Sequence, residues 1–451
     1  MFKKLQARLN TGSERSIIVK KNIFLSLLLK GASILLSLLI VPLTINYVHP
    51  DQYGFWLTLS SLVAWVSYFD LGLGQGLRNR YAESKALGQY DMMSKYISTA
   101  YALMAIIFST VFIVFVFCNM FVDWVALLNI SNVTNETCRS LMVILVGFFC
   151  LNMVFKVTNF VLLGDQQTAF SSLIIVIEQI LSLVFIYVIS KLTESNLLYL
   201  ATITAGVPVL VLFITTCFVY TSKGTLQKCC PSFKKIDFKL SGSLLGIGVK
   251  FFLIQLSLLL IFQVVNIIIS RNCGQDMVAQ YQLSYKYFNM IYMLSTIIMT
   301  PYWSAFTDAY TMGDFVWMKS TYKKLNKILL LCILMSIFML VLSPIFFKIW
   351  INNSISIPLQ MHICMAFYIF AMIFASVRMY ILNGLGKVTL QYMIYMFFAI
   401  VSIPMMNYLS HIVGVYGILI FLSSVYLTQG FIGNIQINKL LNNKSNGIWN
   451  K

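Results

Sequence analysis

The chain has 451 residues, of which 59% are hydrophobic and only 10% are charged. This composition excludes a soluble globular protein, because apolar runs of about 20 residues, long enough to span a bilayer, recur along the whole chain. The formal net charge of +18 lies in short segments between these runs. That distribution indicates membrane topology and argues against a nucleic-acid partner.

Twelve apolar runs follow one another, and we expect each to form a transmembrane helix. Only helices and closed barrels satisfy their backbone hydrogen bonds in lipid, and the runs have helical lengths. We interpret the first run as a retained span, because no small-residue cleavage site follows it. The runs cover residues 24–47, 53–73, 96–120, 140–163, 171–190, 197–220, 244–270, 280–304, 328–350, 359–383, 389–410 and 415–438. The sequence therefore predicts an all-α polytopic membrane protein.

The Lys and Arg residues predict which side of the membrane each connection faces. With the N-terminus in the cytoplasm, the inner connections hold 23 Lys and Arg residues. The outer side holds 4, counting Lys348 at the outer end of the ninth run, and 5 lie deeper within the runs. Membrane proteins carry their excess of basic residues on the cytoplasmic side. We therefore expect both termini in the cytoplasm.

The second run ends in an acidic residue and three alternating glycines, in the stretch YFDLGLGQGLRNRYAES. A nucleotide loop is excluded, because no strand is expected before the glycines, no Lys-Ser/Thr follows them, and their spacing is not GxGxxG. We instead expect Gly72, Gly74 and Gly76 to allow close helix packing at a cytoplasmic mouth. Asp70 is expected within reach of Arg78 or of a cavity cation, where it would hold the end of the second run.

The two halves of the chain resemble each other when one is shifted along the other. At a shift of 220 Lys30 aligns with Lys250, and at 222 Lys156 aligns with Arg378. We expect two six-helix lobes related by a pseudo-twofold axis along the membrane normal, an arrangement in which transporters place the substrate path between the lobes. A duplicated helical scaffold without transport is the alternative. The predicted parts are an N-terminal lobe (1–220), a basic cytoplasmic linker (221–243) and a C-terminal lobe with a basic tail (244–451).

Apart from Lys348 at the outer end of the ninth run, seven Lys, Arg, Asp and Glu residues lie inside the runs, where they are costly and normally face a bundle interior or a wet cavity. They are Lys30, Lys156, Lys250, Lys286, Arg378, Asp70 and Glu178. We expect the five cations to line a substrate cavity, with Asp70 and Glu178 as coupling or structural acids. For Lys250 and Asp70 the alternative is snorkelling to the interface, and Glu178 could instead pair with a cation. A cationic interior with hydroxyl and amide groups suits an anionic, sugar-bearing substrate and does not suit a lipophilic cation.

The cysteines and histidines predict no metal or redox site. The nine cysteines contain no CxxC pair, and the three histidines are far apart in the sequence. We expect the cysteines to be free packing residues, and we expect no cofactor.

Several motifs are typical of one transporter family. They are KGASILLSLLIVPLTINYVHPDQYGFWLTLSSLVAWVSYFDLGLGQGLRNRYAE near the N-terminus, the P-x-x-YG-x-W element within it (Pro50, Tyr53, Gly54 and Trp56), FDLGLGQGLRN, and LNGLGK in the second half. On these motifs the chain resembles the Wzx-type polysaccharide flippases, which carry O-antigen or capsule repeat units. They belong to the multidrug/oligosaccharidyl-lipid/polysaccharide exporter superfamily.

The resemblance implies two six-helix lobes around a central cavity that opens alternately to each side. It implies flipping of an undecaprenyl-pyrophosphate-linked oligosaccharide from the cytoplasmic to the periplasmic leaflet of a bacterial inner membrane. The cationic cavity would receive the pyrophosphate, and Asp70 and Glu178 are the acids available for coupling to an ion gradient. Membrane lipids and the polysaccharide polymerase machinery are the implied partners.

Three rival functions have different requirements. A multidrug exporter of the same superfamily would favour an acid in the first run, whose one charge is Lys30. A membrane enzyme, such as a polymerase or a lipid-dependent glycosyltransferase, needs acids or arginines in a sizeable loop, and none is expected here. A lipid II flippase performs the same chemistry on another head group, usually with a longer chain and extra spans. The sequence therefore favours a transporter over an enzyme.

Overall fold

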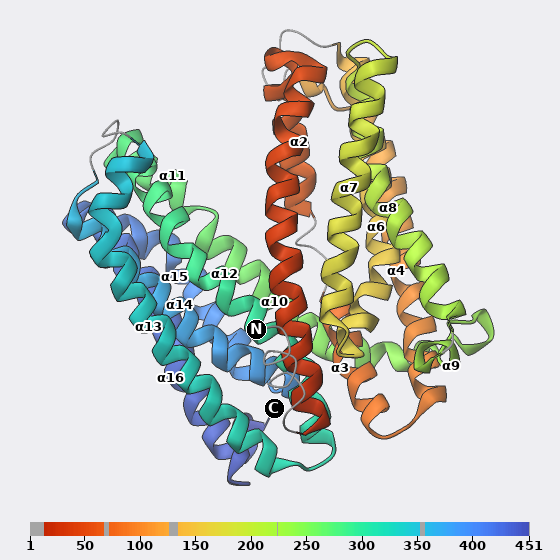
Figure 1. Ribbon diagram of the computed structural model, residues 1–451, viewed down its shortest axis with the longest axis vertical. Helices are drawn as coiled ribbons and strands as arrows, with labels where there is room; N and C mark the ends of the chain where they lie inside the picture. The colour runs from red at the N-terminus through yellow and green to blue at the C-terminus, as the bar shows by residue number, and fades with distance from the viewer. Residues whose placement is uncertain (1–12, 67–71, 126–133, 223, 352–356, 451) are drawn as a thin grey trace, which may run out of the picture. The chain divides into compact units, whose positions relative to one another are not determined.

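The computed structural model describes residues 13–66, 72–125, 134–222, 224–351 and 357–450, and these residues form helices without any strand (Figure 1). The chain divides into two compact units, Met1–Gly248 and Val249–Lys451, which are described separately below.

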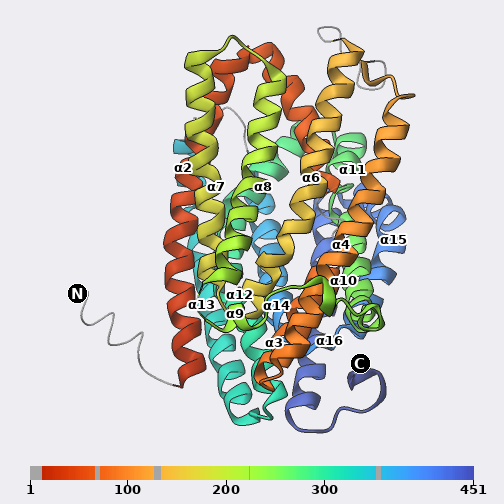
Figure 2. The same cartoon turned by 90° about the vertical axis from the view of Figure 1, so that its right-hand side faces the viewer.

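Unit 1 is a helical bundle followed by a folded linker. Its helices are α2 (Glu14–Val66), α3 (Leu73–Ala86), α4 (Tyr90–Asn119), α6 (Asn135–Gly164), α7 (Thr168–Leu192) and α8 (Leu197–Thr221). The linker contains the short helices α9 (Thr225–Lys228), η1 (Phe233–Lys235) and η2 (Phe238–Leu240). Helix α2 packs on α7, α7 on α8, and α8 on α6, as the view in Figure 2 also shows.

Unit 2 has α14 at its centre, because α14 packs against α12, α13 and α16. Its helices are α10 (Ser241–Phe262), which begins in unit 1, α11 (Val265–Cys273), α12 (Gln275–Thr311), α13 (Phe315–Ile351), α14 (Leu359–Leu385), α15 (Thr389–Val413) and α16 (Val415–Leu441), followed by the short η3 (Gly447–Asn450). Helix α14 is buried along most of its length for this reason.

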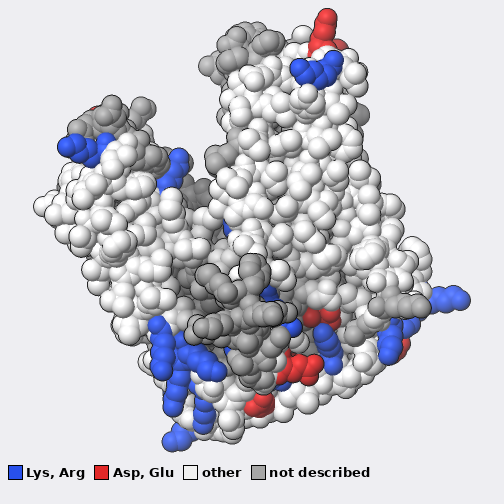
Figure 3. Space-filling model, viewed as in Figure 1, with Lys and Arg blue, Asp and Glu red and all other residues white. Residues whose placement is uncertain are grey.

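Ten helical stretches among the described residues are long and apolar enough to cross a membrane. Helix α2 covers the first predicted run and the second as far as Val66, and the rest of the second run lies largely outside the described residues. The eighth run is helical within α12, but α12 is too polar to be one of the ten. The seventh run is interrupted after Phe262 and resumes at Val265 as α11. In Figure 3 charged residues gather near the ends of each unit and leave uncharged surface between them, as a lipid-facing protein requires.

The backbone repeats itself at two pairs of turns. Gly88 and Gly313 end corresponding helices of the two halves, with φ of 68° and 69°. Gln166 and Gly386 form the second pair, with φ of 64° and 67°, and are separated in the chain by the same offset as Lys30 and Lys250. In all four turns an N–H group bonds back to a carbonyl five residues earlier, which is typical of a helix end closed by a left-handed residue. The matching turns support the internal repeat expected from the sequence.

The linker is docked on α4 by hydrogen bonds. The Ser94 hydroxyl donates to the Cys230 carbonyl at 2.8 Å, and the Thr99 hydroxyl accepts from the Asp237 N–H at 3.0 Å. Lys235 also forms an ion pair with Asp91 at 3.2 Å. These contacts explain why the linker and the start of α10 belong to unit 1.

Candidate substrate site

In unit 1 the deepest predicted cation lies near the predicted acid. Lys156 on α6 is half-buried, with its Nζ 5.9 Å from the centre of the Phe160 ring. Its charge acts on the half-buried carboxylate of Glu178 on α7. The described part of the chain contains no ion pair within 4.0 Å between these two residues. Lys156 and Glu178 are therefore neighbours across two packed helices without direct contact.

The polar residues of the first predicted run differ in their burial. Ser33 and Thr44 are buried in unit 1, while Lys30 is exposed on the surface of α2. Nearer the start of α2, the Asn22 side chain accepts from the Ala169 N–H at 2.9 Å and donates to the Gln166 carbonyl at 2.7 Å. The polar side chain of Asn22 thus joins α2 to the turn before α7 and to the first residues of α7. Lys286 on α12 is exposed as well.

Two lysines lie close together at one end of unit 2. The Nζ of Lys250 donates to the Thr389 hydroxyl at 2.7 Å, and the Nζ of Lys387 donates to the Asn450 carbonyl at 2.8 Å. Burial lowers the pKa of Lys387, and the positive charge of Lys250 lowers that pKa further. Two neighbouring ammonium groups attract an anion such as a phosphate. Lys387 belongs to the LNGLGK motif but was not among the predicted site residues, because it lies in a turn rather than in a span.

Arg378 lies in the interior of unit 2, where only 4% of it is exposed. Its Nη1 donates to the Phe374 carbonyl at 3.1 Å, its Nη2 donates to the Asn326 side chain at 3.0 Å, and the guanidinium lies 4.1 Å from the centre of the Phe374 ring. Its Nε has no hydrogen-bond partner among the described residues. Protein groups thus occupy most of the guanidinium. Convergence of Lys30, Lys156 and Lys250 with Arg378 on one cavity stays a prediction, because it depends on both units.

The glycine stretch brings α3 close to two other segments. Gly72 has a φ of 65° and begins α3. A Cβ atom at Gly74 would lie 2.1 Å from the Phe160 ring, and one at Gly76 would lie 2.4 Å from the Leu244 carbonyl oxygen. Glycine is needed at both positions for this packing. Arg78 is buried in the same helix, whereas Asp70 lies outside the described residues, and the cytoplasmic mouth stays a prediction.

An acidic residue that sequence analysis did not select joins three segments of unit 1. The buried Asp165 carboxylate follows α6 and pairs with Lys85 of α3 at 2.7 Å. It also accepts hydrogen bonds from the Tyr81 hydroxyl at 2.9 Å and from the Gln167 amide at 2.6 Å. Burial and the Asp165 charge raise the pKa of Tyr81 far above its ordinary value. Asp165 lies in a connection between two predicted runs, so it was not among the charges inside the runs that indicated a site.

The interior of unit 2 contains a cluster of tyrosines from four helices. Rings of Tyr281 and Tyr285 stack with centres 6.2 Å apart, and those of Tyr368 and Tyr426 lie 6.0 Å apart. The full cluster is Tyr281, Tyr285, Tyr292, Tyr368, Tyr395 and Tyr426. The spacing of Tyr281, Tyr285 and Tyr292 along one helix face was the signal that could have indicated it.

Unpaired polar atoms are buried on the same helices. Gln391 on α15 and Gln429 on α16 are each 1% exposed, and Ser284 on α12 is fully buried. Four of their side-chain atoms have no hydrogen-bond partner among the described residues: both polar atoms of Gln391, the Gln429 Oε1 and the Ser284 Oγ. Buried polar atoms of this kind are normally satisfied by water or by a polar ligand. The unit 2 interior can therefore offer amide and hydroxyl groups beside aromatic rings.

Comparison with solved structures identifies this arrangement of helices. An outward-facing multidrug resistance MATE family transporter of the MOP superfamily aligns with a TM-score of 0.77 at 13% identity, covering 97% of this chain and 98% of that one. The chain has the fold of the MATE transporters. A Vibrio cholerae MATE transporter in its bent form also aligns, with a TM-score of 0.74 at 11% identity over 95% of this chain and 99% of that one. The MATE fold confirms the predicted class, an all-α polytopic membrane protein of two six-helix lobes.

Two further similarities extend beyond the multidrug transporters. A MOP superfamily transporter from Pyrococcus furiosus, described as having a binding pocket of reversed polarity, aligns with a TM-score of 0.71 at 14% identity over 98% of both chains. A Salmonella typhi protein described as "Putative O-antigen transporter" is 20% identical over 383 residues, which is 81% of each chain. No family model matches the sequence. The resemblance to polysaccharide flippases drawn from the motifs therefore agrees with a curated relative and with the MATE fold.

Proposed function

We propose that this multi-pass membrane protein is a flippase for surface polysaccharide synthesis. It would move an undecaprenyl-pyrophosphate-linked oligosaccharide repeat unit from the cytoplasmic to the periplasmic leaflet by alternating access. The protein would lie in a bacterial inner membrane with both termini in the cytoplasm, next to the polysaccharide polymerase machinery. The observation that carries the proposal is the unit 2 interior, where buried amide atoms without partners lie on helices that also carry the tyrosine cluster.

These groups match the chemistry of a sugar. Sugar hydroxyls both donate and accept hydrogen bonds, and the amide of Gln391 offers a donor and an acceptor that the described protein leaves unused. A site built to bond hydroxyl groups discriminates strongly against ligands that lack them, because its buried polar atoms would then stay unpaired.

The charges of unit 2 suit the pyrophosphate. Residues 249–451 contain thirteen Lys and Arg but only three acids, Asp276, Asp308 and Asp314. Lys250 and Lys387 already lie near each other. A pyrophosphate held by several cations in a partly dry site is attracted strongly, because the effective dielectric is lower than in water. The Salmonella typhi relative and the reversed polarity described for the Pyrococcus furiosus transporter point the same way.

A multidrug exporter is the second candidate, since the first solved structure above is one. Glu178 is the observation that favours it, because a carboxylate inside the bundle could bind an organic cation. The neighbouring charge of Lys156 opposes that role. A lipid II flippase would use the same groups as the proposed protein and differs only in its head group.

The direct test is transport in reconstituted vesicles. Fluorescent undecaprenyl-pyrophosphate oligosaccharide in one leaflet should become accessible to a membrane-impermeant glycosidase on the other side only when the protein is present. Gln391→Ala should slow this movement, while Gln263→Ala, which removes an exposed amide, should not. Export of ethidium without movement of the oligosaccharide would replace the proposal by the multidrug function. Faster movement of lipid II than of the oligosaccharide would assign the other flippase function.

A further inference from the structure

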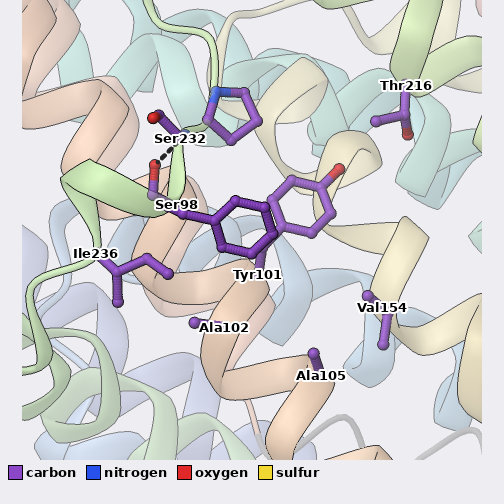
Figure 4. Close-up of a pocket in the computed structure, with 10 residues that line it drawn as sticks. Ser98, Tyr101, Ala102, Ala105, Val154, Thr216, Ser232 and Ile236 are labelled. Atoms are coloured by element: carbon purple, nitrogen blue, oxygen red, sulfur yellow. Dashed lines mark hydrogen bonds between the residues drawn. The ribbon is translucent and has the colours of Figure 1, made fainter.

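Unit 1 contains a cavity of about 350 Å³ between its transmembrane helices and the docked linker (Figure 4). We call it the linker pocket. Tyr101, Ala102 and Ala105 of α4 form one wall, Val154 of α6 and Thr216 of α8 form the other, and the linker closes one side with residues 231–233 and Ile236. The pocket thus lies at the end of α4 where the predicted span begins.

Three polar side chains that line the linker pocket, Ser98, Tyr101 and Thr216, bond to other protein groups. The Ser98 hydroxyl accepts from the Ser232 N–H at 3.0 Å and donates to the Ser94 carbonyl at 2.7 Å. The Thr216 hydroxyl donates to the Leu212 carbonyl at 2.7 Å. The Tyr101 hydroxyl is hydrogen-bonded to the Thr158 hydroxyl of α6 at 2.5 Å. Apart from the Ser232 hydroxyl, the rest of the lining is aromatic and aliphatic surface, which suits a hydrocarbon chain and offers little to a polar ligand.

The linker segment that closes the pocket carries both apolar and basic residues. Phe233 lines the pocket yet is 94% exposed, which is unusual unless a membrane or a partner covers it. Lys234 follows Phe233 in the chain, and Lys239 lies three residues after the pocket-lining Ile236. Both are exposed, and their ammonium groups have no partner in the described part of the chain.

The acids around the linker do not neutralise this charge. Asp91 forms ion pairs with Lys95 at 2.9 Å and with Lys235 at 3.2 Å. Asp237 bonds through its carboxylate to the Lys239 N–H at 3.0 Å. With Lys228 included, the start of α4 and the described linker carry five lysines and two aspartates. The unpaired ammonium groups of Lys234 and Lys239 therefore leave positive charge on the linker that carries the exposed Phe233.

We propose that the linker pocket binds an anionic phospholipid of the cytoplasmic leaflet, with one acyl chain in the pocket and its phosphate at Lys234 and Lys239. This lipid site requires the linker to be cytoplasmic, but it does not depend on an oligosaccharide being the transported substrate. Anionic lipids concentrate at the cytoplasmic surface, and each lysine near that surface contributes about 1 kcal/mol to their attraction, or about fivefold in affinity. The bound lipid holds the linker, which leads directly into α10, against α4. Transport is therefore expected to depend on anionic lipid whatever the cargo is.

Native mass spectrometry of the purified full-length chain tests the acyl-chain contact. The protein is delipidated and then mixed with phosphatidylglycerol or with phosphatidylcholine of the same chain length. The wild type should retain one phosphatidylglycerol under activation that removes the others. Ala102→Trp fills the pocket and should abolish this retention, whereas Ile113→Trp, on the exposed surface of the same helix, should not. Ala105→Phe replaces Ala102→Trp if that variant does not purify as a folded protein.

The lysines are tested by their effect on lipid preference. Lys234→Gln and Lys239→Gln should each lower the preference for phosphatidylglycerol over phosphatidylcholine about fivefold, while Lys444→Gln in the exposed tail should leave it unchanged. Equal binding of the two lipids by the wild type, or full retention by both pocket-filling variants, would overturn the proposal. So would undecaprenyl phosphate displacing phosphatidylglycerol at equal concentration, because the pocket would then hold a prenyl chain.

Discussion

Lys85 and Asp165 form an ion pair of 2.7 Å between α3 and the turn that follows α6. The Asp165 side chain is 5% exposed, and that of Lys85 is 35% exposed, so the pair is partly screened by solvent. Tyr81 donates a further hydrogen bond to the same carboxylate. This single acid therefore holds the short helix α3, which the glycine stretch begins, against the end of α6.

Asp165→Asn should destabilise unit 1, because it removes a charge from a buried group that accepts two hydrogen bonds and pairs with Lys85. We expect a loss of about 1–3 kcal/mol, read as a lower melting temperature in detergent. Glu83→Gln is the control on the same helix: its pair with Arg80 is more exposed, and its loss should cost less than about 1 kcal/mol. Equal melting temperatures for the two variants would show that Asp165 does not hold α3.

Gly76→Ala should destabilise the protein, because the new Cβ would lie 2.4 Å from the backbone oxygen of Leu244, which cannot move without displacing the start of α10. Overpacking of this kind costs about 1–3 kcal/mol. Gly31→Ala is the matched control, since nothing lies within 4 Å of its added Cβ. The measurement is the melting temperature of each variant. A Gly76→Ala protein as stable as Gly31→Ala would refute the close packing of α3.

Adjacent cysteines should report both the docking and the sidedness of the linker. Cys229 is fully buried, and burial raises the pKa of its thiol to about 11, with the Asp165 charge adding to the effect. Since the thiolate is the reactive form, Cys229 should react slowly near pH 7 and faster only as the pH approaches 11. Cys230 is exposed and should be alkylated readily in the purified protein, as peptide mass spectrometry can show.

In intact cells a membrane-impermeant maleimide should spare Cys230, while a permeant one should label it. Labelling by the impermeant reagent would place the linker outside the cytoplasm and contradict the predicted topology. A Cys230→Ser variant identifies the labelled peptide.

Lys156→Ala combined with Arg378→Ala should abolish surface polysaccharide while leaving the protein in the membrane, if these cations receive the pyrophosphate. Lys191→Ala, an exposed lysine at the end of α7, should have no effect. Normal export by the double variant would contradict the cationic-cavity hypothesis.

Arg378→Lys separates binding from packing. Arg378 forms two hydrogen bonds through separate guanidinium nitrogens and lies over the Phe374 ring, which a lysine cannot reproduce. Asn326→Ala removes one of those partners without changing the charge. If Arg378 serves packing alone, both variants should lower the melting temperature and transport together. If it binds substrate, Arg378→Lys should reduce transport by more than Asn326→Ala at equal stability.

Hydropathy and charge by themselves determined the membrane helices and the repeat. Lipid offers no hydrogen bonds, so each spanning segment must be apolar, helical and about 20 residues long, and these local requirements can be read from residues such as those of α14 and α15. The repeat was readable because matching helices keep matching residues at a nearly constant offset. The break between Phe262 and Val265 was not readable, because an apolar run continues across it.

Tertiary structure alone decided which polar residues meet. Asp165 pairs with a lysine of α3, and Arg378 bonds to an asparagine of α13, although the partners in each pair belong to different elements and lie far apart in the chain. Ser98 of α4 likewise bonds to Ser232 of the distant linker. No local pattern encodes such pairs, since each depends on how the helices pack and rotate about their axes.

Burial is also a property of the packed bundle. Lys30 and Arg378 look alike in the sequence, because each is a cation inside an apolar run, yet one is exposed and the other is enclosed. The sequence specifies the charge of each side chain. The fold alone decides its exposure to solvent and its neighbours, and these determine the free energy of burying that charge.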